Sequence, residues 1–537
     1  MADRENEGVF LCRCNGRVSA GIPLNDLREY LEAAQPGLRV VIGDNLCQAP
    51  VLRDLMREQE MRPSVIGGCA QLKSRPGFWE EPESCLLDPD TVGLVDLLGE
   101  AESPYSPDDR WTRVKALLLA KVKRQEKFDG IPPRARRIHF ATPQGEVTRR
   151  DLLQSILPRY RLAPYVDTAR CVGERCRVCR QACPSEAISV DAGRLSIDVL
   201  RCQGCGACSA VCPSRAVSYP NYSLEQLEAE LAGLLSDCVA DFRPIVAFVC
   251  QNADLDSIDQ KLWPPNLFVV EVPCLALIPA WLMLRAYELG AQGLILVVDK
   301  EKCRLKIEES MWRGTADFVQ AVLGEIGVGR KRFMVAEGDS GIARLPEMIH
   351  EMSGLPCMSR ALPEKPATPA EALTPAAVIV GLVAQIGGSL DGTVSSGKVP
   401  FGKLRLDRRR CTACGICVPE CPAEALTAVS DADSLKIIFK QADCIGCGQC
   451  AEICPEKCLE VERVLELSKL VGEPEVLLEG DFVRCVWCGT PFAPRSMYEK
   501  LRDRIAAAGG NVSQLEKCPE CRMKGRSPGT KMSRSGV

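Results

Sequence analysis

Eight cysteines between residues 411 and 455 constrain this chain more than any other feature. They form two runs, CTACGICVPECP and CIGCGQCAEICP, that share the spacing C-x2-C-x2-C-x3-C-P. Three thiols in such a tight loop hold three irons of one cluster, and the fourth, before proline, reaches the other cluster. The spacing therefore predicts two [4Fe–4S] clusters, one on Cys411, Cys414, Cys417 and Cys454 and one on Cys444, Cys447, Cys450 and Cys421.

A second copy of the pattern lies in CVGERCRVCRQACP and CQGCGACSAVCP, within residues 166–220. Its first gap is two residues longer, which an exposed loop tolerates. A predicted hairpin, AISVDAGRLSID, lies between the runs, as ALTAVSDADSLKIIF does in the other copy. Both copies, at 166–220 and 401–465, have the pattern of ferredoxin-like domains. The same crossed rule predicts clusters on Cys171, Cys176, Cys179 and Cys212, and on Cys202, Cys205, Cys208 and Cys183.

The composition indicates where such clusters could persist. The chain has 31 cysteines in 537 residues, only two histidines and a net charge of −4. No basic field favours a nucleic-acid partner. The polar start MADRENEGVF lacks the apolar region of an export signal, and no apolar run approaches the roughly 18 residues of a transmembrane segment. We therefore expect thiolate ligands in a reducing cytoplasm rather than disulfides.

Residues 1–100 read as a small α/β domain. Strands are expected at 9–12, 39–42 and 64–67, and helices at 24–34 and 51–59. Cys12, Cys14, Cys47 and Cys69 fall at strand ends or just beyond them, where ligands collect in α/β sheets. Two interpretations stay open, namely four convergent ligands or four buried cysteines without a metal.

The stretches GVFLCRCNGRVSAGI, DNLCQAP and IGGCA resemble the N-terminal domain of the A-type subunit of heterodisulfide reductase. The resemblance implies an iron–sulfur cluster on the same four cysteines. It covers about 70 residues, and the flavin-binding portion of that family is missing, because no G-x-G-x-x-G follows a strand here. We therefore expect no flavin in this chain.

Residues 101–165 read as a helical connector. SPDDRWTRVKALLLAKVKRQEK predicts a capped amphipathic helix over 106–127 whose charged face is solvated. The basic, proline-rich stretch 131–137 reads as a linker or surface strand. His139 is expected to be structural.

Residues 240–350 change to alternating strands and helices. Continuous apolar strands are expected at 244–250, 267–274, 293–299 and 332–336, with helices at 278–289 and 307–326. Fully apolar strands that alternate with helices predict a parallel sheet covered on both faces. Cys250, Cys274 and Cys303 lie at the ligand-binding edge of that sheet.

The pieces AFVCQNA, VVEVPC, ELGAQGLILV and KEKCRLKIEE resemble the delta subunit of methyl-viologen-reducing hydrogenase. The resemblance implies a [2Fe–2S] cluster and a link between a hydrogenase or formate dehydrogenase and a heterodisulfide reductase module. Ala253 stands where the family has a second cysteine, and another family cysteine near Val298–Asp299 is also missing. The domain either keeps a cluster, with a fourth ligand such as Asp299, or serves only for docking.

The remaining segments contain a linker and a second kind of thiol site. Residues 355–400, rich in Pro, Ala, Gly and Ser, read as a flexible linker around one short apolar segment. Cys458 falls outside the ferredoxin spacing and reads as a spare thiol. Two C-x2-C knuckles at 480–525 flank a helix expected at 496–508, which fits structural zinc better than an iron–sulfur centre. Their ligands would be Cys485, Cys488, Cys518 and Cys521.

Together the patterns predict a multidomain α/β and α+β protein with two ferredoxin-like 2[4Fe–4S] domains, a parallel hydrogenase-delta-like domain, a small N-terminal domain and a C-terminal four-cysteine knuckle. The resemblances imply an electron-transfer subunit that relays electrons between a hydrogenase or formate dehydrogenase and a flavin-containing heterodisulfide-reductase-like subunit. Two alternatives remain, namely a cluster-based thiol or disulfide reductase, and a redox-sensing scaffold.

Overall fold

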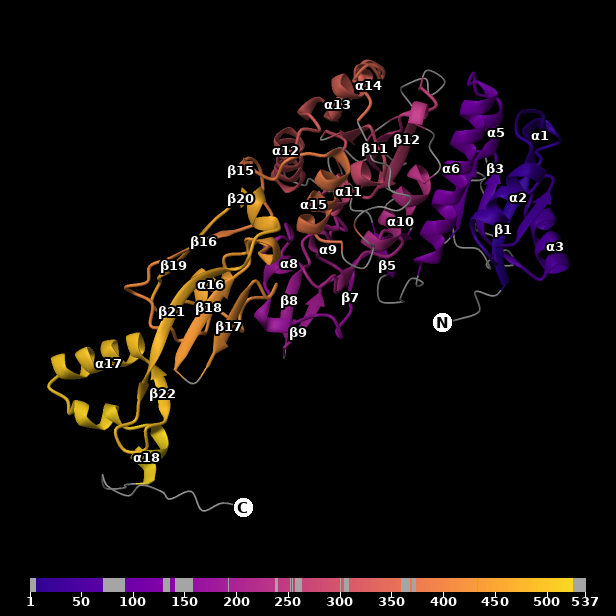
Figure 1. Cartoon of the computed structure of the whole chain (residues 1–537). Coiled ribbons are helices and arrows are strands. Elements are labelled where there is room, and N and C mark those ends of the chain that lie inside the picture. The colour runs from indigo at the N-terminus through magenta and orange to yellow at the C-terminus, as the bar shows by residue number, and fades with distance from the viewer. Residues whose placement is uncertain are drawn as a thin grey trace, which may run out of the picture. The chain divides into compact units, whose positions relative to one another are not determined.

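The computed structural model describes residues 6–70, 92–128, 136–140, 158–191, 193–236, 240–251, 253, 255, 263–299, 301–303, 309–358, 368, 373–431 and 433–524. Of the stretch 131–137, expected to be a linker or surface strand, residues 131–135 lie outside these residues, and 136–137 belong to a strand. The tail beyond residue 525 and the side chain of His139 also lie outside them. The chain divides into two units, Met1–Cys171 with Val178–Ser389, and Val172–Arg177 with Leu390–Val537 (Figure 1). None of the helices in the described residues has both the length and the apolar content needed to cross a membrane.

The N-terminal residues form a four-stranded parallel sheet in the order β2-β1-β3-β4. Both faces are covered, which explains why β1 is buried along almost its whole length. Leu27 and Leu31 of one helix cover one face, and Leu52 and Met56 of another cover the opposite face. The elements are β1 (Glu7–Cys12), α1 (Arg17–Gly21), α2 (Leu24–Ala34), β2 (Val40–Gly43), α3 (Ala49–Gln59), β3 (Arg62–Gly68), β4 (Gly93–Asp96) and α5 (Leu97–Ala101).

Helix α6 (Pro107–Glu126) belongs to this layer and does not act as a connector. Ser106 caps it by accepting the N–H of Asp109 at 3.1 Å. Val114, Leu118 and Val122 lie in the same hydrophobic core as the N-terminal sheet. The prediction of a connector over 101–165 is therefore wrong for this helix, because its apolar face packs against the N-terminal sheet.

The charged face of α6 is not simply solvated either. Arg113 donates to Glu100 at 2.8 Å and to the carbonyl of Pro265 at 3.0 Å. Lys121 and Arg124 both pair with Glu230, whose side chain is buried. Glu230 lies on α10 (Leu224–Leu235), which packs against α6 so closely that a Cβ at Gly233 would lie 2.4 Å from the Cα of Ala120. The expectation of a solvated face is wrong because a second layer covers it.

The central residues form another four-stranded parallel sheet, in the order β12-β11-β13-β14. Every residue of β11 and β13 is buried, as the continuous apolar runs predict. The pattern 307–326 yields a helix that the described residues show from Ser310. The elements are β11 (Ile245–Cys250), β12 (Leu267–Val272), α11 (Ala280–Leu289), β13 (Gly293–Val298), α12 (Ser310–Glu325), β14 (Phe333–Glu337), α13 (Gly338–Ala343) and α14 (Leu345–Ser353).

Helix α15 (Pro375–Ile386) lies within the stretch expected to be a linker. Thr374 caps it at 3.1 Å through the N–H of Ala377, and Pro375 occupies the first turn. Val378, Ile379 and Leu382 are buried, and the helix packs on α11. The linker prediction over 355–400 is therefore corrected at 375–386, since the short apolar segment docks instead of remaining a spacer.

The first ferredoxin-like region consists of short elements joined by cysteine-rich loops. Its hairpin pairs β8 with β9, as predicted, and β7 pairs with β10. A separate antiparallel pair precedes it, formed by β5 (Arg136–Phe140) and β6 (Pro158–Leu162). The elements are β7 (Tyr165–Val166), α8 (Val178–Gln181), β8 (Ile188–Asp191), β9 (Arg194–Ile197), α9 (Ala207–Ala210) and β10 (Val217–Ser218).

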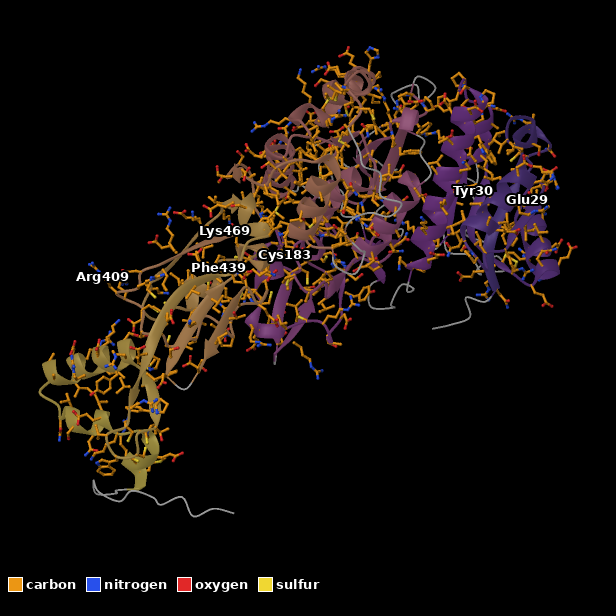
Figure 2. The ribbon with its side chains drawn as sticks, in the orientation of Figure 1. Glu29, Tyr30, Cys183, Arg409, Phe439 and Lys469 are labelled. Atoms are coloured by element: carbon orange, nitrogen blue, oxygen red, sulfur yellow. The ribbon has the colours of Figure 1, made fainter. Side chains whose placement is uncertain are left out.

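The second ferredoxin-like region and the C-terminal knuckle share one sheet, in the order β17-β18-β21-β22. The predicted boundary between 401–465 and 480–525 is crossed by the ten-residue strand β21, which pairs with β18 and with β22. Phe439 ends β18 and is buried (Figure 2). The elements are β15 (Thr393–Val394), β16 (Lys403–Leu406), β17 (Leu426–Ser430), β18 (Ser434–Phe439), α16 (Gln449–Ile453), β19 (Leu459–Glu462), β20 (Leu465–Glu466), β21 (Glu475–Arg484), β22 (Pro491–Pro494), α17 (Arg495–Ala507) and α18 (Pro519–Lys524).

Candidate metal and iron–sulfur sites

The second ferredoxin-like region gathers its cysteines in the crossed sets that the spacing predicts. Cys411, Cys414 and Cys417 line one cavity together with Cys454 from the other run. Cys444, Cys447 and Cys450 lie near Cys421, close enough for their charges to interact. In each set the fourth thiol comes from the opposite run.

The first ferredoxin-like region repeats this arrangement for one set. Cys202, Cys205 and Cys208 line a single cavity with Cys183. Three members of the other set, Cys171, Cys179 and Cys212, share one hydrophobic core. Cys176 belongs to Val172–Arg177, the stretch grouped with the second unit.

The buried thiols are poor acids when no cation is near. Burial and the charges of neighbouring thiols raise the pKa of Cys205 to about 11, although the N–H of Ala207 opposes that shift. The pKa of Cys450 is raised to about 12, mainly by burial and then by the charges of Cys444 and Cys447. Thiolates crowded in this way need positive charge between them, and iron supplies it. The donor sets therefore fit iron–sulfur clusters.

Cys458 adds a fifth thiol to the cavity of Cys411, Cys414, Cys417 and Cys454. Its Sγ lies 3.4 Å from Cys454 Sγ, and both side chains are buried. Burial opposes ionisation of Cys454, yet the N–H and thiol of Cys458 and two further backbone N–H groups lower the pKa of Cys454. The spacing rule missed Cys458 because it lies four residues past the last patterned cysteine.

The four N-terminal cysteines converge at the carboxyl edge of their sheet. Cys12 ends β1, and Cys14 Sγ lies 3.3 Å from Cys12 Sγ. Burial is the largest cause of the raised pKa of Cys14. The hydrogen bond with Cys12 and the charges of Cys12, Cys69 and Cys47 raise it further, so all four thiols are close enough to interact. Positive φ angles of 49° at Cys14 and 56° at Asn15 turn the chain back over the strand end. These residues fit a shared metal or cluster.

The central domain brings Cys250, Cys274 and Cys303 to the corresponding edge. Burial raises the pKa of Cys274, as do the charges of Cys250, Cys205 and Cys303. Asp299 is almost fully buried just beyond β13. Its Oδ1 accepts the N–H of Lys302 at 3.0 Å, while its Oδ2 lies 3.2 Å from Lys302 Nζ without hydrogen-bond geometry. The Asp299 carboxylate is therefore held by Lys302, which directly precedes Cys303 in the chain.

The central thiols adjoin the first ferredoxin-like region. Cys274 and Cys205 are buried in the same small core, with Ala207 and Ala276. Gly206, at φ 75°, leaves room for the Leu277 side chain at this junction, because a Cβ there would lie 2.6 Å from Leu277 Cδ1. This junction was not predicted, since the two cysteines are 69 positions apart and belong to separate motifs.

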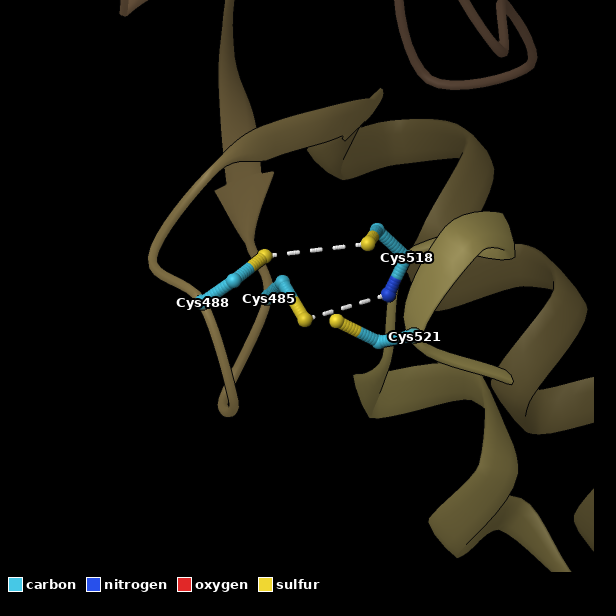
Figure 3. Close-up of side chains that lie close together, drawn as sticks. All are labelled: Cys485, Cys488, Cys518 and Cys521. Atoms are coloured by element: carbon cyan, nitrogen blue, oxygen red, sulfur yellow. Dashed lines mark hydrogen bonds between the residues drawn. The ribbon is translucent and has the colours of Figure 1, made fainter. Parts of the chain in front are cut away.

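The C-terminal cysteines form the most compact group. Among the described residues, Cys485, Cys488, Cys518 and Cys521 are the only group of three or more Cys, His, Asp or Glu residues whose ligand atoms all lie within 4.8 Å of one another (Figure 3). Cys488 Sγ and Cys518 Sγ are 3.7 Å apart. A tetrahedral site with metal–sulfur bonds of about 2.3 Å places its sulfurs about 3.8 Å apart. The group fits one mononuclear metal, since a four-iron cluster binds each sulfur to a different iron.

Backbone amides prepare the same site for a cation. The N–H of Cys518 donates to Cys485 Sγ at 3.2 Å. Burial opposes ionisation of Cys485, but the N–H groups of Cys518, Cys488 and Trp487 lower its pKa to about 6. The N–H groups stabilise a thiolate, which is the form that binds zinc. The predicted helix between the knuckles is present as α17.

Three protein-family models match parts of the chain. Residues 245–354 match the family model described as methyl-viologen-reducing hydrogenase, delta subunit. Residues 163–213 and 410–459 each match a model described as a 4Fe–4S dicluster domain. No curated protein matches the chain.

These matches confirm the delta-type domain and the two ferredoxin-like regions predicted from the sequence. Two dicluster domains indicate iron–sulfur clusters, and with the delta-type domain they support a role in iron–sulfur electron transfer. The resemblance of the N-terminal domain to the A-type heterodisulfide reductase family stays a prediction, as does each individual ligand set.

Proposed function

We propose that the chain is an electron-transfer subunit whose two ferredoxin-like regions hold four [4Fe–4S] clusters and whose N-terminal domain holds a further iron–sulfur cluster. The observation that carries the proposal is the crossed grouping of cysteines, in which Cys183 joins Cys202, Cys205 and Cys208, and Cys454 joins Cys411, Cys414 and Cys417. Such clusters exchange single electrons. The protein's contribution is burial and N–H donors to sulfur, such as Ala187 N to Cys183 Sγ at 3.3 Å.

The central domain extends this relay to a partner. Because Cys274 packs beside Cys205, a cluster on the central thiols would lie next to one in the first ferredoxin-like region. We propose that Cys250, Cys274, Cys303 and the Asp299 carboxylate hold it. The delta-type domain would dock a hydrogenase or formate dehydrogenase, and a flavin-containing heterodisulfide-reductase-like subunit would be the other partner. At the C-terminus, Cys485, Cys488, Cys518 and Cys521 would hold zinc.

Iron, acid-labile sulfide and zinc analysis of the anaerobically purified chain tests the proposal, with EPR spectroscopy during stepwise reduction. We expect about 20 irons from five four-iron clusters, about two more if the central thiols hold a [2Fe–2S] cluster, and one zinc. The variant Cys521→Ala is the matched control, and it should lose the zinc while the iron content stays at the wild-type value. A protein without iron, or with iron that no low-potential donor reduces, would refute an electron-transfer role.

A further inference from the structure

The last of the four cysteine runs differs from the other three at one position in the loop that follows it. After each C-P step the chain continues for two residues and then reaches a small residue. The residue before that position has a left-handed backbone in all four runs, with φ of 49°, 51°, 53° and 48°, and its N–H donates to the carbonyl of the C-P cysteine. The four loops therefore share one backbone conformation. The small residues are Ala187, Ala216, Ala425 and Cys458.

Cys458 thus places a sulfur where the other loops place a methyl group. The N–H groups of Ala187 and Ala216 donate to their C-P sulfurs at 3.3 and 3.2 Å, which shows how near this position lies to the ligand. In the fourth loop the added sulfur is 3.4 Å from Cys454 Sγ. It also lines the cavity that Cys411, Cys414 and Cys417 share with Cys454.

We propose that Cys458 is a second sulfur donor for the iron that Cys454 binds. The inference rests on the proposed function, since it requires a cluster in this cavity. While Cys454 is present, the Cys458 thiol lies within hydrogen-bond distance of its sulfur. When Cys454 is lost, Cys458 loses its thiol proton to solvent and its sulfur forms the bond to iron. The other three sites have no such reserve because alanine offers no ligand.

The test compares two equivalent substitutions, Cys454→Ala and Cys421→Ala, in the full chain purified anaerobically. Cys421→Ala should lose about four irons and the matching sulfide, because Ala425 cannot replace the missing ligand. Cys454→Ala should keep the wild-type iron content. The double variant Cys454→Ala/Cys458→Ala should lose about four irons, whereas Cys458→Ala alone should lose none. Loss of iron by Cys454→Ala equal to that of Cys421→Ala would overturn the proposal.

A transplant keeps the question answerable if Cys454→Ala does not accumulate as folded protein. Adding Ala425→Cys to Cys421→Ala gives the neighbouring loop the same reserve sulfur. We expect the lost irons and their EPR signal to return, and failure to return would count against a reserve ligand. Wild-type protein analysed alongside separates the two proposals, because absence of iron there refutes the electron-transfer role itself.

Discussion

The N-terminal and central domains contain two parallel sheets with the same strand order. In both domains, the second strand in sequence order lies at the edge of the sheet, and the first, third and fourth strands follow it across the sheet. The match extends to the cysteines at the carboxyl edge. Cys12 and Cys250 end the first strands, Cys47 and Cys274 follow the second, and Cys69 and Cys303 follow the third.

The difference lies just past the first strand. The N-terminal chain continues with Arg13 and Cys14, whereas the central chain continues with QNA and has no thiol there. The left-handed backbone at Cys14 brings a fourth sulfur within 3.3 Å of Cys12. The comparison teaches that the sheet order fixes where three cysteines gather, while a short loop decides whether a fourth joins them.

The largest expected effect follows from removing that fourth thiol. Cys14→Ala should reduce the N-terminal set to three cysteines and abolish its cluster, because an unfilled iron position labilises the whole assembly. We expect the iron content of the full chain to fall by one complete cluster, measured with acid-labile sulfide. Cys357→Ala is the matched control, since Cys357 is exposed and belongs to none of the sets, and it should change neither value. Unchanged iron in Cys14→Ala would show that this sheet edge holds no cluster.

Much of this architecture could be predicted from local sequence. Continuous apolar runs predicted the buried strands β11 and β13, and cysteine spacing predicted which thiols would cross between runs. Such features depend on residues close in the chain or on one geometric rule. The ends of α2 were predicted to the residue, because its apolar periodicity is strong and Pro23 precedes it.

The rest depended on contacts between distant residues. Helix α6 looked like a solvated connector because Lys121 and Arg124 reach a partner, Glu230, that is more than 100 positions away. Helix α15 looked like a linker because its twelve residues are flanked by Pro, Ala and Gly, and its packing on α11, a distant part of the chain, is not visible in the local sequence. Cys458 obeys no spacing rule, and only comparison among the four loops reveals its position.

A smaller effect is expected from breaking the ion pair between α6, which packs on the N-terminal sheet, and α10. Glu230→Gln should leave Arg124 buried without its ionic partner, and breaking a buried pair in this way costs about 3–5 kcal/mol. Hydrogen–deuterium exchange of α6 and α10 should report a lower free energy of opening. Glu102→Gln, which breaks the exposed pair with Arg17, should cost about 0–1 kcal/mol. Equal costs for the two variants would contradict a role for α6 in joining the layers.

The ion pairs of Glu230 with Arg124 and Lys121 also predict how the stability of the protein changes with pH. Burial opposes ionisation of Glu230, but Arg124 and Lys121 lower its pKa below the ordinary value. A carboxyl with a depressed folded pKa contributes stability above its unfolded pKa of about 4.3 and loses it as pH falls through the folded value. The stability difference between the wild type and Glu230→Gln should therefore be constant above about pH 5 and shrink below about pH 4.

The smallest effect is expected from giving the central sheet the thiol that it lacks. Ala253 follows Cys250 by three residues, donates its N–H to the Cys250 carbonyl at 2.8 Å and packs against the core of the sheet. Ala253→Cys should add a fourth sulfur near Cys250, Cys274 and Cys303, and slow the loss of central iron to a chelator by a few-fold. Ala253→Ser matches cysteine in shape but offers oxygen, so it should lose iron at the wild-type rate. If both variants lose iron at the same rate, a sulfur at position 253 does not reach the metal, and this loop cannot supply the fourth thiol that Cys14 adds in the N-terminal sheet.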